Sequence, residues 1–358
     1  MAEDQHVRVA CPMGASVMCL LLLSAVIPLI AQAPANPPSR LHAIMRDFEA
    51  EGFSGVVLVE RHGTVEFLEA YGYADRRQKI RNTPDTRFEM ASLTKPFTSA
   101  AILKLQDQGK LRTSDQLDRY IGPLKPPKNL ATIHHLALHR AGLVVEGTSP
   151  PGDSREAFLQ GIRTSPAEST PGDRYRYTNA GYGVLAAIIE IVSGTSYNDY
   201  LRREILLPLG LREAYFRGET VPGLALGYQT PPDDPEPGSS SNSKSAWDHG
   251  AGGLMISVPD LHMAFKGLRS GKVLSKESLE IMFHPWPEEG YGWHVRKDAG
   301  GRRLIEKGGG HSSYASHLLH YPDDRVTIIW ATNSLHKRFR ADLNRRLTEA
   351  VLGVTVSK

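Results

Sequence analysis

The 358-residue sequence contains little cysteine, little net charge and no motif typical of a metal site. Its two cysteines, Cys11 and Cys19, both lie in the N-terminal leader, so the chain beyond residue 33 has neither a disulfide nor a reactive thiol. The formal net charge of +3 and the lack of a basic cluster with interleaved aromatic residues argue against nucleic-acid binding. No group of His, Asp and Glu residues has metal-ligand spacing, so we expect neither a metal nor another cofactor.

The longest apolar run lies at the N-terminus. Residues 14–33 are almost wholly apolar, and Ala31-Gln32-Ala33 has the small-x-small form of a signal-peptidase site. The positive charge that usually precedes such a run is weak, because Glu3 and Asp4 offset Arg8. We predict that residues 1–33 are a signal peptide or, since roughly 20 apolar residues can span a bilayer, a membrane anchor. In both cases we expect an exported protein, periplasmic or secreted, with its hydrolase domain in residues 34–358.

Ser92-Leu93-Thr94-Lys95 stands where a polar stretch gives way to a long apolar segment. On a helix, a serine and a lysine three residues later lie on the same side, one turn apart. The amine can then reach the hydroxyl, and the helix N-terminus favours developing negative charge. These groups suit an activated serine nucleophile. A serine N-cap followed by an exposed lysine would give the same sequence pattern. No G-x-S-x-G elbow surrounds Ser92, which argues against an α/β-hydrolase.

The same S-x-x-K pattern occurs twice more, at residues 241–244 and 334–337. The first copy lies in a Pro/Gly/Ser-rich run, which is typical of a surface loop. The second follows a predicted strand and enters a basic stretch, so we expect an exposed turn. Only Ser92 precedes apolar residues at helical spacing, with Pro96 in the first turn and Gly109 as a stop.

Strands are predicted near both ends of the chain, with helices between them. Alternating apolar residues and turn signals place strands at 55–60, 65–71, 292–296, 303–307, 313–321 and 325–332. Helices are expected after Ser39 as an N-cap, at 180–192, from Asp260, and around Leu343 and Leu347. The simplest arrangement is an α+β fold with one antiparallel sheet flanked by helices. This sheet lobe would contain residues of about 38–80 and 285–355. A large helical insertion would form a second lobe of about 92–270.

Three motifs, in this order, resemble those of the serine β-lactamase and penicillin-binding-protein superfamily. They are Ser92-Leu93-Thr94-Lys95, then Tyr177-Thr178-Asn179 for the family's Tyr-x-Asn, and Lys307-Gly308-Gly309 for its Lys-Thr-Gly. Within the superfamily the chain is similar to the class C β-lactamase, D-alanyl-D-alanine carboxypeptidase and family VIII carboxylesterase branch. Flanking stretches at 86–91, 136–143 and 250–254 also resemble family segments, so the likeness covers about residues 40–350.

The resemblance implies a β-lactamase/transpeptidase-like fold and an acyl-enzyme mechanism. Ser92 would be the acylated nucleophile, and Lys95 would assist the removal of its proton. Tyr177 would relay that proton to the leaving group, its phenolate favoured by the ammonium groups of Lys95 and Lys307. Asn179 would orient Lys95 and a substrate amide.

The third motif implies the substrate-binding strand. Gly309 and Gly310 belong to it, and the backbone N–H of Gly310 would form the oxyanion hole together with that of Ser92. Each motif residue also has a purely structural alternative: Asn179 could be an N-cap, Lys307 could end a strand in solvent, and the glycines could form a bend. His139 and His311 are expected to be structural.

One departure bears on the substrate. Gly308 replaces the family's usual Thr, so a hydroxyl that would help to hold a substrate carboxylate is missing, while Lys307 remains to attract an anion. The small-molecule substrate is therefore expected to be an ester or peptide, handled by carboxylesterase or D-amino-acid peptidase-like chemistry. The alternatives are a β-lactamase, or a non-catalytic relative that binds peptidoglycan or acts as a scaffold.

Overall fold

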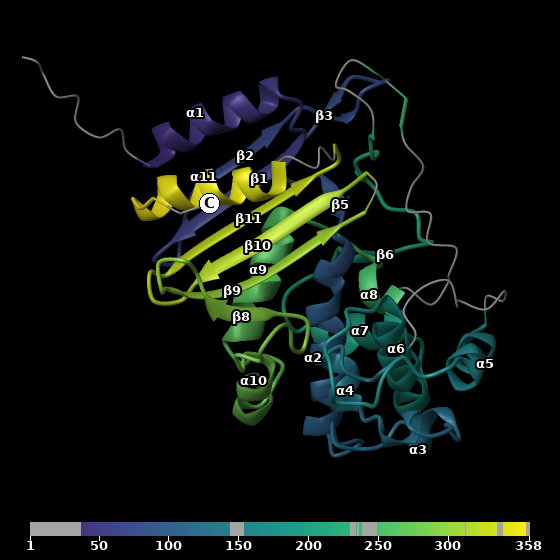
Figure 1. Ribbon diagram of the computed structural model, residues 1–358. Coiled ribbons are helices and arrows are strands. Elements are labelled where there is room, and N and C mark those ends of the chain that lie inside the picture. The colour runs from purple at the N-terminus through teal and green to yellow at the C-terminus, as the bar shows by residue number, and fades with distance from the viewer. Residues whose placement is uncertain are drawn as a thin grey trace, which may run out of the picture. The chain divides into compact units, whose positions relative to one another are not determined.

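A six-stranded antiparallel sheet forms the centre of the computed structural model (Figure 1). The structure describes residues 37–143, 154–229, 234, 236–237, 249–311, 313–334 and 339–355. The predicted leader and the S-x-x-K copy at 241–244 lie outside these ranges. In sheet order the strands are β2 (Thr64–Tyr71), β1 (Gly55–Arg61), β11 (Val326–Thr332), β10 (Ala315–Tyr321), β9 (Arg303–Gly310) and β8 (His294–Lys297).

The sheet joins the two ends of the folded chain, as the α+β prediction requires. β1 pairs with β11 from Gly55 opposite Thr332 to Arg61 opposite Val326. The β1–β2 hairpin closes through His62 and Gly63, whose φ angles of 50° and 90° fit the two-residue turns that match strand twist. Two small sheets complete the strands: β3 (Tyr73–Asp75) with β4 (Ile80–Arg81), and β5 (Arg87–Glu89), β7 (Leu254–Ser257) and β6 (Tyr215–Phe216) in that order.

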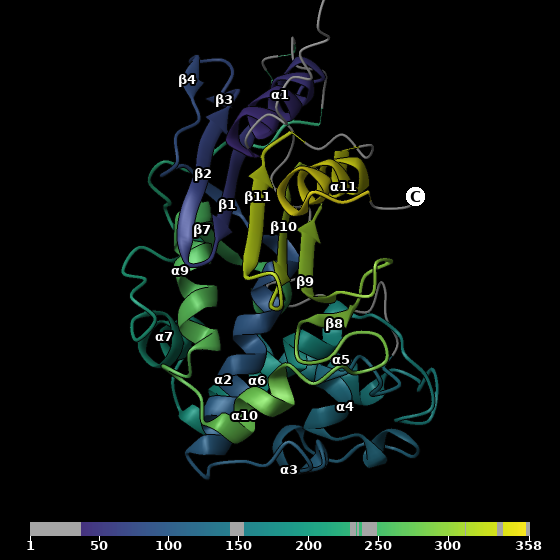
Figure 2. The ribbon, with the colours of Figure 1, turned by 90° about the vertical axis from the view of Figure 1, so that its left-hand side faces the viewer.

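Helices cover both faces of the large sheet, which explains why its central strands are apolar on both sides. On β1, Val57 and Val59 join a core with helices α1 and α11, while Val56 and Leu58 join the core of the helical region. Figure 2 shows α1 and α11 together on one face, and α9 and α2 toward the other. The helices of this arrangement are α1 (Pro37–Ala50), α2 (Lys95–Asp107), α9 (Val258–Arg269), α10 (Lys276–Met282) and α11 (Phe339–Leu352).

The remaining helices lie between β5 and β7 in the sequence and form the helical region. They are α3 (Asp118–Ile121), α4 (Ile133–Ala137), α5 (Arg155–Thr164), α6 (Asn179–Ser193), α7 (Tyr197–Leu201) and α8 (His249–Gly252), with short turns η1 (Ala91–Thr94), η2 (Lys128–Leu130) and η3 (Arg202–Leu206). Residues 36–358 form one compact unit, and its division into two lobes stays a prediction. Across the described ranges, no helix combines the length and apolarity needed to span a bilayer.

Several predicted boundaries were wrong. α1 already begins at Pro37, so Ser39 lies inside it, and α9 begins at Val258 with the Ser257 side chain accepting a hydrogen bond from the Asp260 backbone N–H. β9 continues through the three glycines to Gly310 instead of ending at Lys307. Pairing with β10, which places Gly310 opposite Ala315, overrides the weak strand preference of glycine.

Candidate active site

Ser92 lies at the junction between β5 and α2. The backbone N–H of Met90 donates to the Leu254 carbonyl over 2.9 Å, which ties this junction to β7. The next residue, Ala91, is buried and has a φ of +47°, a left-handed conformation that is strained for alanine. Ser92 follows in the 3-10 turn η1, so it precedes the first turn of α2 instead of lying within it as predicted.

The hydroxyl of Ser92 contacts two other proton-bearing groups. Its Oγ lies 2.7 Å from the hydroxyl oxygen of Tyr177, and Lys95 Nζ donates to it over 3.1 Å. Tyr177 comes from the segment just before α6, and both Ser92 and Tyr177 are partly exposed. The structure therefore brings together the three residues that the motifs singled out as catalytic.

Lys95 is fully buried, with its side-chain nitrogen among fixed acceptors. Nζ donates to Asn179 Oδ1 over 2.8 Å and to the Ala251 carbonyl over 3.0 Å. These two acceptors hold the nitrogen beside Ser92, to which it also donates. Thr178 occupies the N-cap position of α6, so the alternative that Asn179 serves as an N-cap is wrong.

The S-x-x-K copy at Ser334 has a different environment. Ser334 is buried, and its Oγ accepts a hydrogen bond from Arg76 Nη2 over 3.0 Å. The prediction of an exposed turn is therefore wrong for Ser334, while the rest of this copy lies outside the described residues. The side chain of Ser334 connects the segment after β11 to Arg76.

Strand β9 approaches the nucleophile through a glycine. A Cβ added to Gly309 would overlap the carbonyl oxygen of Met90 and would lie 3.0 Å from the backbone nitrogen of Ser92. Only glycine allows the strand to lie this close to the nucleophile. Gly310 follows at the exposed end of the strand, and the oxyanion hole formed by its backbone N–H and that of Ser92 stays a prediction.

Lys307, from the same strand, forms a buried ion pair that the sequence analysis missed. Its Nζ lies 2.5 Å from Oε1 of Glu289, and only 2% and 1% of the two side chains are exposed. The alternative that Lys307 ends in solvent is therefore wrong, and its charge already has a partner. The signal that could have indicated Glu289 is a pair of adjacent acids directly before the apolar Gly290-Tyr291-Gly292-Trp293.

His139 connects this ion pair to Tyr177. Its ring stacks on the Tyr177 ring with centroids 4.5 Å apart, and its Nε2 lies 3.4 Å from Glu289 Oε1. Nδ1 accepts from the Thr178 backbone N–H over 3.1 Å, so the proton of the neutral ring sits on Nε2 and faces the carboxylate. Burial lowers the pKa of His139 to about 4, which keeps the ring neutral. The described residues offer no trio of His, Cys, Asp or Glu side chains able to hold a metal ion.

The protonation of Tyr177 differs from the expectation. Burial raises the pKa of Tyr177 above its ordinary value, and the nearby carboxylate of Glu289 raises it further. The expected effect of two ammonium groups fails because Glu289 offsets the charge of Lys307. Tyr177 is therefore a neutral phenol at neutral pH, suited to give a proton to a leaving group.

Gly308 also differs from the expectation. A Cβ added there would lie 3.1 Å from His317 Nδ1 and 3.4 Å from Cζ of Arg340, so a side chain would meet these residues first. Arg340, near the start of α11, donates a hydrogen bond to the Gly309 carbonyl. The glycine at 308 thus leaves room for the guanidinium of Arg340. Compared with a threonine, Gly308 removes a hydroxyl and also leaves space for this positive charge.

His311, just after β9, lies against a second buried carboxylate. Its Nε2 is 3.2 Å from Oε2 of Glu89, which also accepts a hydrogen bond from Arg217. Burial alone would raise the pKa of Glu89, but the contacts with His311 and Arg217 outweigh it and lower the pKa. Because Glu89 ends β5 three positions before Ser92, this contact joins the end of β9 to the nucleophile segment.

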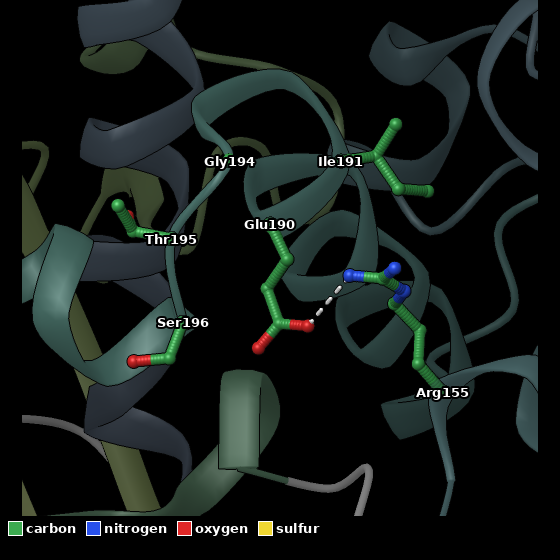
Figure 3. A pocket seen from close by; sticks show the side chains of 6 residues that line it. All are labelled: Arg155, Glu190, Ile191, Gly194, Thr195 and Ser196. Atoms are coloured by element: carbon green, nitrogen blue, oxygen red, sulfur yellow. Dashed lines mark hydrogen bonds and ion pairs between the residues drawn. The ribbon is translucent and has the colours of Figure 1, made fainter.

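A separate open pocket of about 460 Å³ lies at the far end of α6 (Figure 3). Arg155 and Glu190 are paired across it, with 3.1 Å between Nη1 and Oε2. Its serine, Ser196, is hydrogen-bonded to Asp199 over 2.7 Å, and neither a lysine nor a tyrosine lines the pocket. This pocket therefore does not carry the chemistry found at Ser92. The lining residues are Arg155, Glu190, Ile191, Gly194, Thr195 and Ser196.

The chain is similar to proteins of known sequence and structure. A relative described as "Putative penicillin-binding protein PbpX" of Bacillus subtilis is 33% identical over an alignment of 252 residues that covers 67% of this chain. The match spans only 61% of the length of that relative. The octameric penicillin-binding protein homologue from Pyrococcus abyssi is 26% identical, with a TM-score of 0.75 over 88% of this chain and 77% of that one.

The fold is also that of a D-amino acid amidase from Ochrobactrum anthropi. That structure has a TM-score of 0.75 and 22% identity, and it covers 88% of this chain and 99% of its own. A family model described as Beta-lactamase matches residues 41–352, which include every residue of the site described above. The chain therefore belongs to the Beta-lactamase family.

Proposed function

We propose that this chain hydrolyses a small ester or amide through an acyl-enzyme, as a carboxylesterase or a D-amino-acid peptidase-like enzyme. The observation that carries the proposal is the position of Ser92 Oγ, 2.7 Å from the Tyr177 hydroxyl and 3.1 Å from Lys95 Nζ. A nucleophile needs a nearby group that accepts its proton and another that returns a proton to the leaving group. The names of the matched proteins, a penicillin-binding protein and an amidase, support acyl transfer to a serine.

In the proposed acylation, Ser92 Oγ bonds to the acyl carbon, and the bond from that carbon to the leaving group breaks. The proton of Ser92 passes to the Lys95 and Tyr177 pair, and Tyr177 gives a proton to the departing alkoxide or amine. Water then attacks the acyl carbon, the bond to Ser92 Oγ breaks, and one proton of the water returns to Ser92. The products are a carboxylic acid and an alcohol or amine.

Asn179 and the end of β9 would supply the positioning. Asn179 is exposed although it holds Lys95, so the same amide can also reach a substrate. Ser92 and Gly310 would donate backbone N–H groups to the oxyanion, and Gly309 allows β9 to approach. A negative oxygen that forms next to preoriented donors is the usual source of transition-state stabilisation in acyl transfer.

We also propose that the protein is exported. The support is the leader of residues 1–33, with its apolar run and the small-x-small site at Ala31-Gln32-Ala33. Edman sequencing of the protein recovered outside the cytoplasm tests this directly. Asn-terminal or Pro-terminal chains that begin near residue 34 would indicate cleavage, and an intact leader in the membrane fraction would indicate an anchor.

The activity is tested by intact-mass analysis of residues 34–358 and of Ser92→Ala. Each protein is incubated with a fluorophosphonate, a penicillin and a p-nitrophenyl ester, while release of p-nitrophenol is followed. We expect an adduct in the wild type that is absent in Ser92→Ala, and ester turnover faster than penicillin turnover. Fast penicillin turnover would favour the β-lactamase alternative. No adduct and no turnover with any reagent would favour the non-catalytic peptidoglycan-binding or scaffold alternative.

A further inference from the structure

The cation of the third motif is already neutralised inside the protein. Lys307 Nζ lies 2.5 Å from Glu289 Oε1, and both side chains are almost fully buried. A hydrogen bond between two charged groups at this distance is stronger than one between neutral groups. Lys307 is therefore already paired with a carboxylate of the protein before a substrate binds.

Glu289 is held in place from more than one side. His139 Nε2 lies 3.4 Å from Oε1, and His294 Nε2 lies 3.2 Å from Oε2. Burial on its own would raise the pKa of Glu289, but Lys307 and the two histidines outweigh it and hold the pKa well below its usual range. The carboxylate is therefore ionised at neutral pH, and it cannot turn away from Lys307 without losing contacts on both of its oxygens.

The ion pair lies beside the reacting groups. Lys307 Nζ is 5.2 Å from the centre of the Tyr177 ring, and Lys95 Nζ is 4.8 Å from the same centre. Arg340 is a second cation at this end of β9, and the nearest atoms place its guanidinium against Gly308 and Gly310. A substrate carboxylate that approached Lys307 would come close to the carboxylate of Glu289. Two like charges repel strongly where water is largely excluded.

We propose that Glu289 is a specificity-determining residue that makes this site select substrates without a carboxylate on the group next to Lys307. This inference rests on the proposed function and narrows its substrate class to uncharged esters and amides. A neutral leaving group leaves the Glu289–Lys307 pair intact. A carboxylate would have to share Lys307 with Glu289, so that two negative charges would compete for one buried ammonium group.

The test uses two probes of equal size that differ in charge. 3-Carboxyphenylboronic acid and 3-carbamoylphenylboronic acid can both bond to a serine hydroxyl without turnover, so calorimetry gives the ratio of their dissociation constants. The wild type is expected to bind the carbamoyl probe more tightly. Glu289→Gln should shift the ratio toward the carboxy probe by at least about tenfold, because Lys307 loses its internal partner.

Three further variants separate charge from structure. Glu288→Gln is the matched control, since Glu288 is exposed and its side chain pairs with Arg140 over 2.7 Å, and the ratio should equal that of the wild type. Lys307→Gln removes the ammonium group that offsets the charge of Glu289 and should move the ratio in the opposite direction. The double variant Glu289→Gln/Lys307→Gln removes both charges and should return the ratio close to that of the wild type.

The proposal is overturned by a Glu289→Gln ratio equal to that of the wild type, by a wild type that prefers the carboxy probe, or by a wild type that binds neither probe. If Glu289→Gln does not fold, Lys307→Gln tests the proposal instead, because its probe ratio should shift the opposite way. An unchanged ratio in Lys307→Gln also overturns the proposal. Ester turnover and its loss in Ser92→Ala are measured separately. If the protein is an active esterase but Glu289→Gln leaves the probe ratio unchanged, only this inference is disproved.

Discussion

Ser92 and Tyr177 are 85 positions apart in the sequence, and their hydroxyl oxygens lie 2.7 Å apart in the structure. Two contacts of His139 fix this relationship: its ring stacks on Tyr177, and its Nδ1 accepts from the backbone N–H of Thr178. Tyr177 is thus held at both its ring and its backbone. A rigid hydroxyl so close to the nucleophile is what proton transfer requires.

Replacing Tyr177 by Phe should lower kcat for an ethyl ester by about 100-fold to 10,000-fold, because the alkoxide leaving group loses its proton donor. The ring remains to stack on His139, so the melting temperature should change little. Tyr175→Phe, the same change two residues away, is the control and should keep wild-type kcat. A Tyr177→Phe variant as active as this control would show that another group donates the proton.

Asn179→Leu should lower kcat at least about tenfold, because Lys95 loses the acceptor that lies 2.8 Å from its Nζ. The start of α6 should be preserved, since Thr178 and not Asn179 occupies the N-cap position. Steady-state kinetics and far-ultraviolet circular dichroism on the same sample separate the two effects. Loss of helix together with activity would restore a capping role for Asn179.

Gly309→Ala should destabilise the fold by about 1–3 kcal/mol, because its Cβ would overlap the Met90 carbonyl oxygen behind the nucleophile. Labelling of Ser92 by a fluorophosphonate should slow as well. Gly252→Ala serves as the control, since a Cβ there would meet its nearest atoms at 3.6 Å, an ordinary contact distance. Urea denaturation of both variants measures the difference, and equal free energies of unfolding would contradict the close approach of β9.

Glu306 should make the protein less stable in acid. Burial alone would raise the pKa of Glu306, but hydrogen bonds from His317, 3.0 Å away, and from Arg296 hold it at about 2. A carboxyl whose folded pKa is lowered stabilises the fold above its unfolded pKa of about 4.5, and this contribution is lost as the pH falls toward 2. The loss is about 3 kcal/mol.

The variant Glu306→Gln isolates this contribution. Its free energy of unfolding should be lower than that of the wild type at pH 7, and the difference should shrink between pH 4.5 and pH 2. Denaturation curves across this range measure it. A difference that stays constant with pH would mean that Glu306 has the same pKa in the folded and unfolded protein.

Local patterns predicted much of the fold. The His62-Gly63 turn and the apolar run Val56 to Val59 were enough to place the β1–β2 hairpin, and the N- and C-terminal strands meet in one sheet as expected. Boundaries failed where tertiary pairing decides them. Gly308 to Gly310 have poor strand preferences, and they continue β9 because β10 and the nucleophile segment pack against them.

The site was predictable only for residues with fixed spacing. Ser92 and Lys95 lie one turn apart in the chain, so their contact follows from local geometry. Glu289 reaches Lys307 across 18 positions, from a loop with no periodic pattern, and the adjacent acids Glu288 and Glu289 give only a weak signal that one of them is buried. Burial and then the charge of Glu289 raise the pKa of Tyr177, and both depend on tertiary contacts that the motifs do not contain.

The pairing of β1 with β11 has a consequence for biogenesis. Gly55 cannot find its partner Thr332 until the chain between them has been made, which at typical elongation rates takes roughly 15 to 55 s. During this time the β1–β2 hairpin presents an unpaired apolar edge, and such an edge is prone to associate with other chains. Correct assembly therefore depends on shielding an early hairpin until the last strand arrives, and ribosome-bound chains that end before residue 326 should be the form most prone to aggregate.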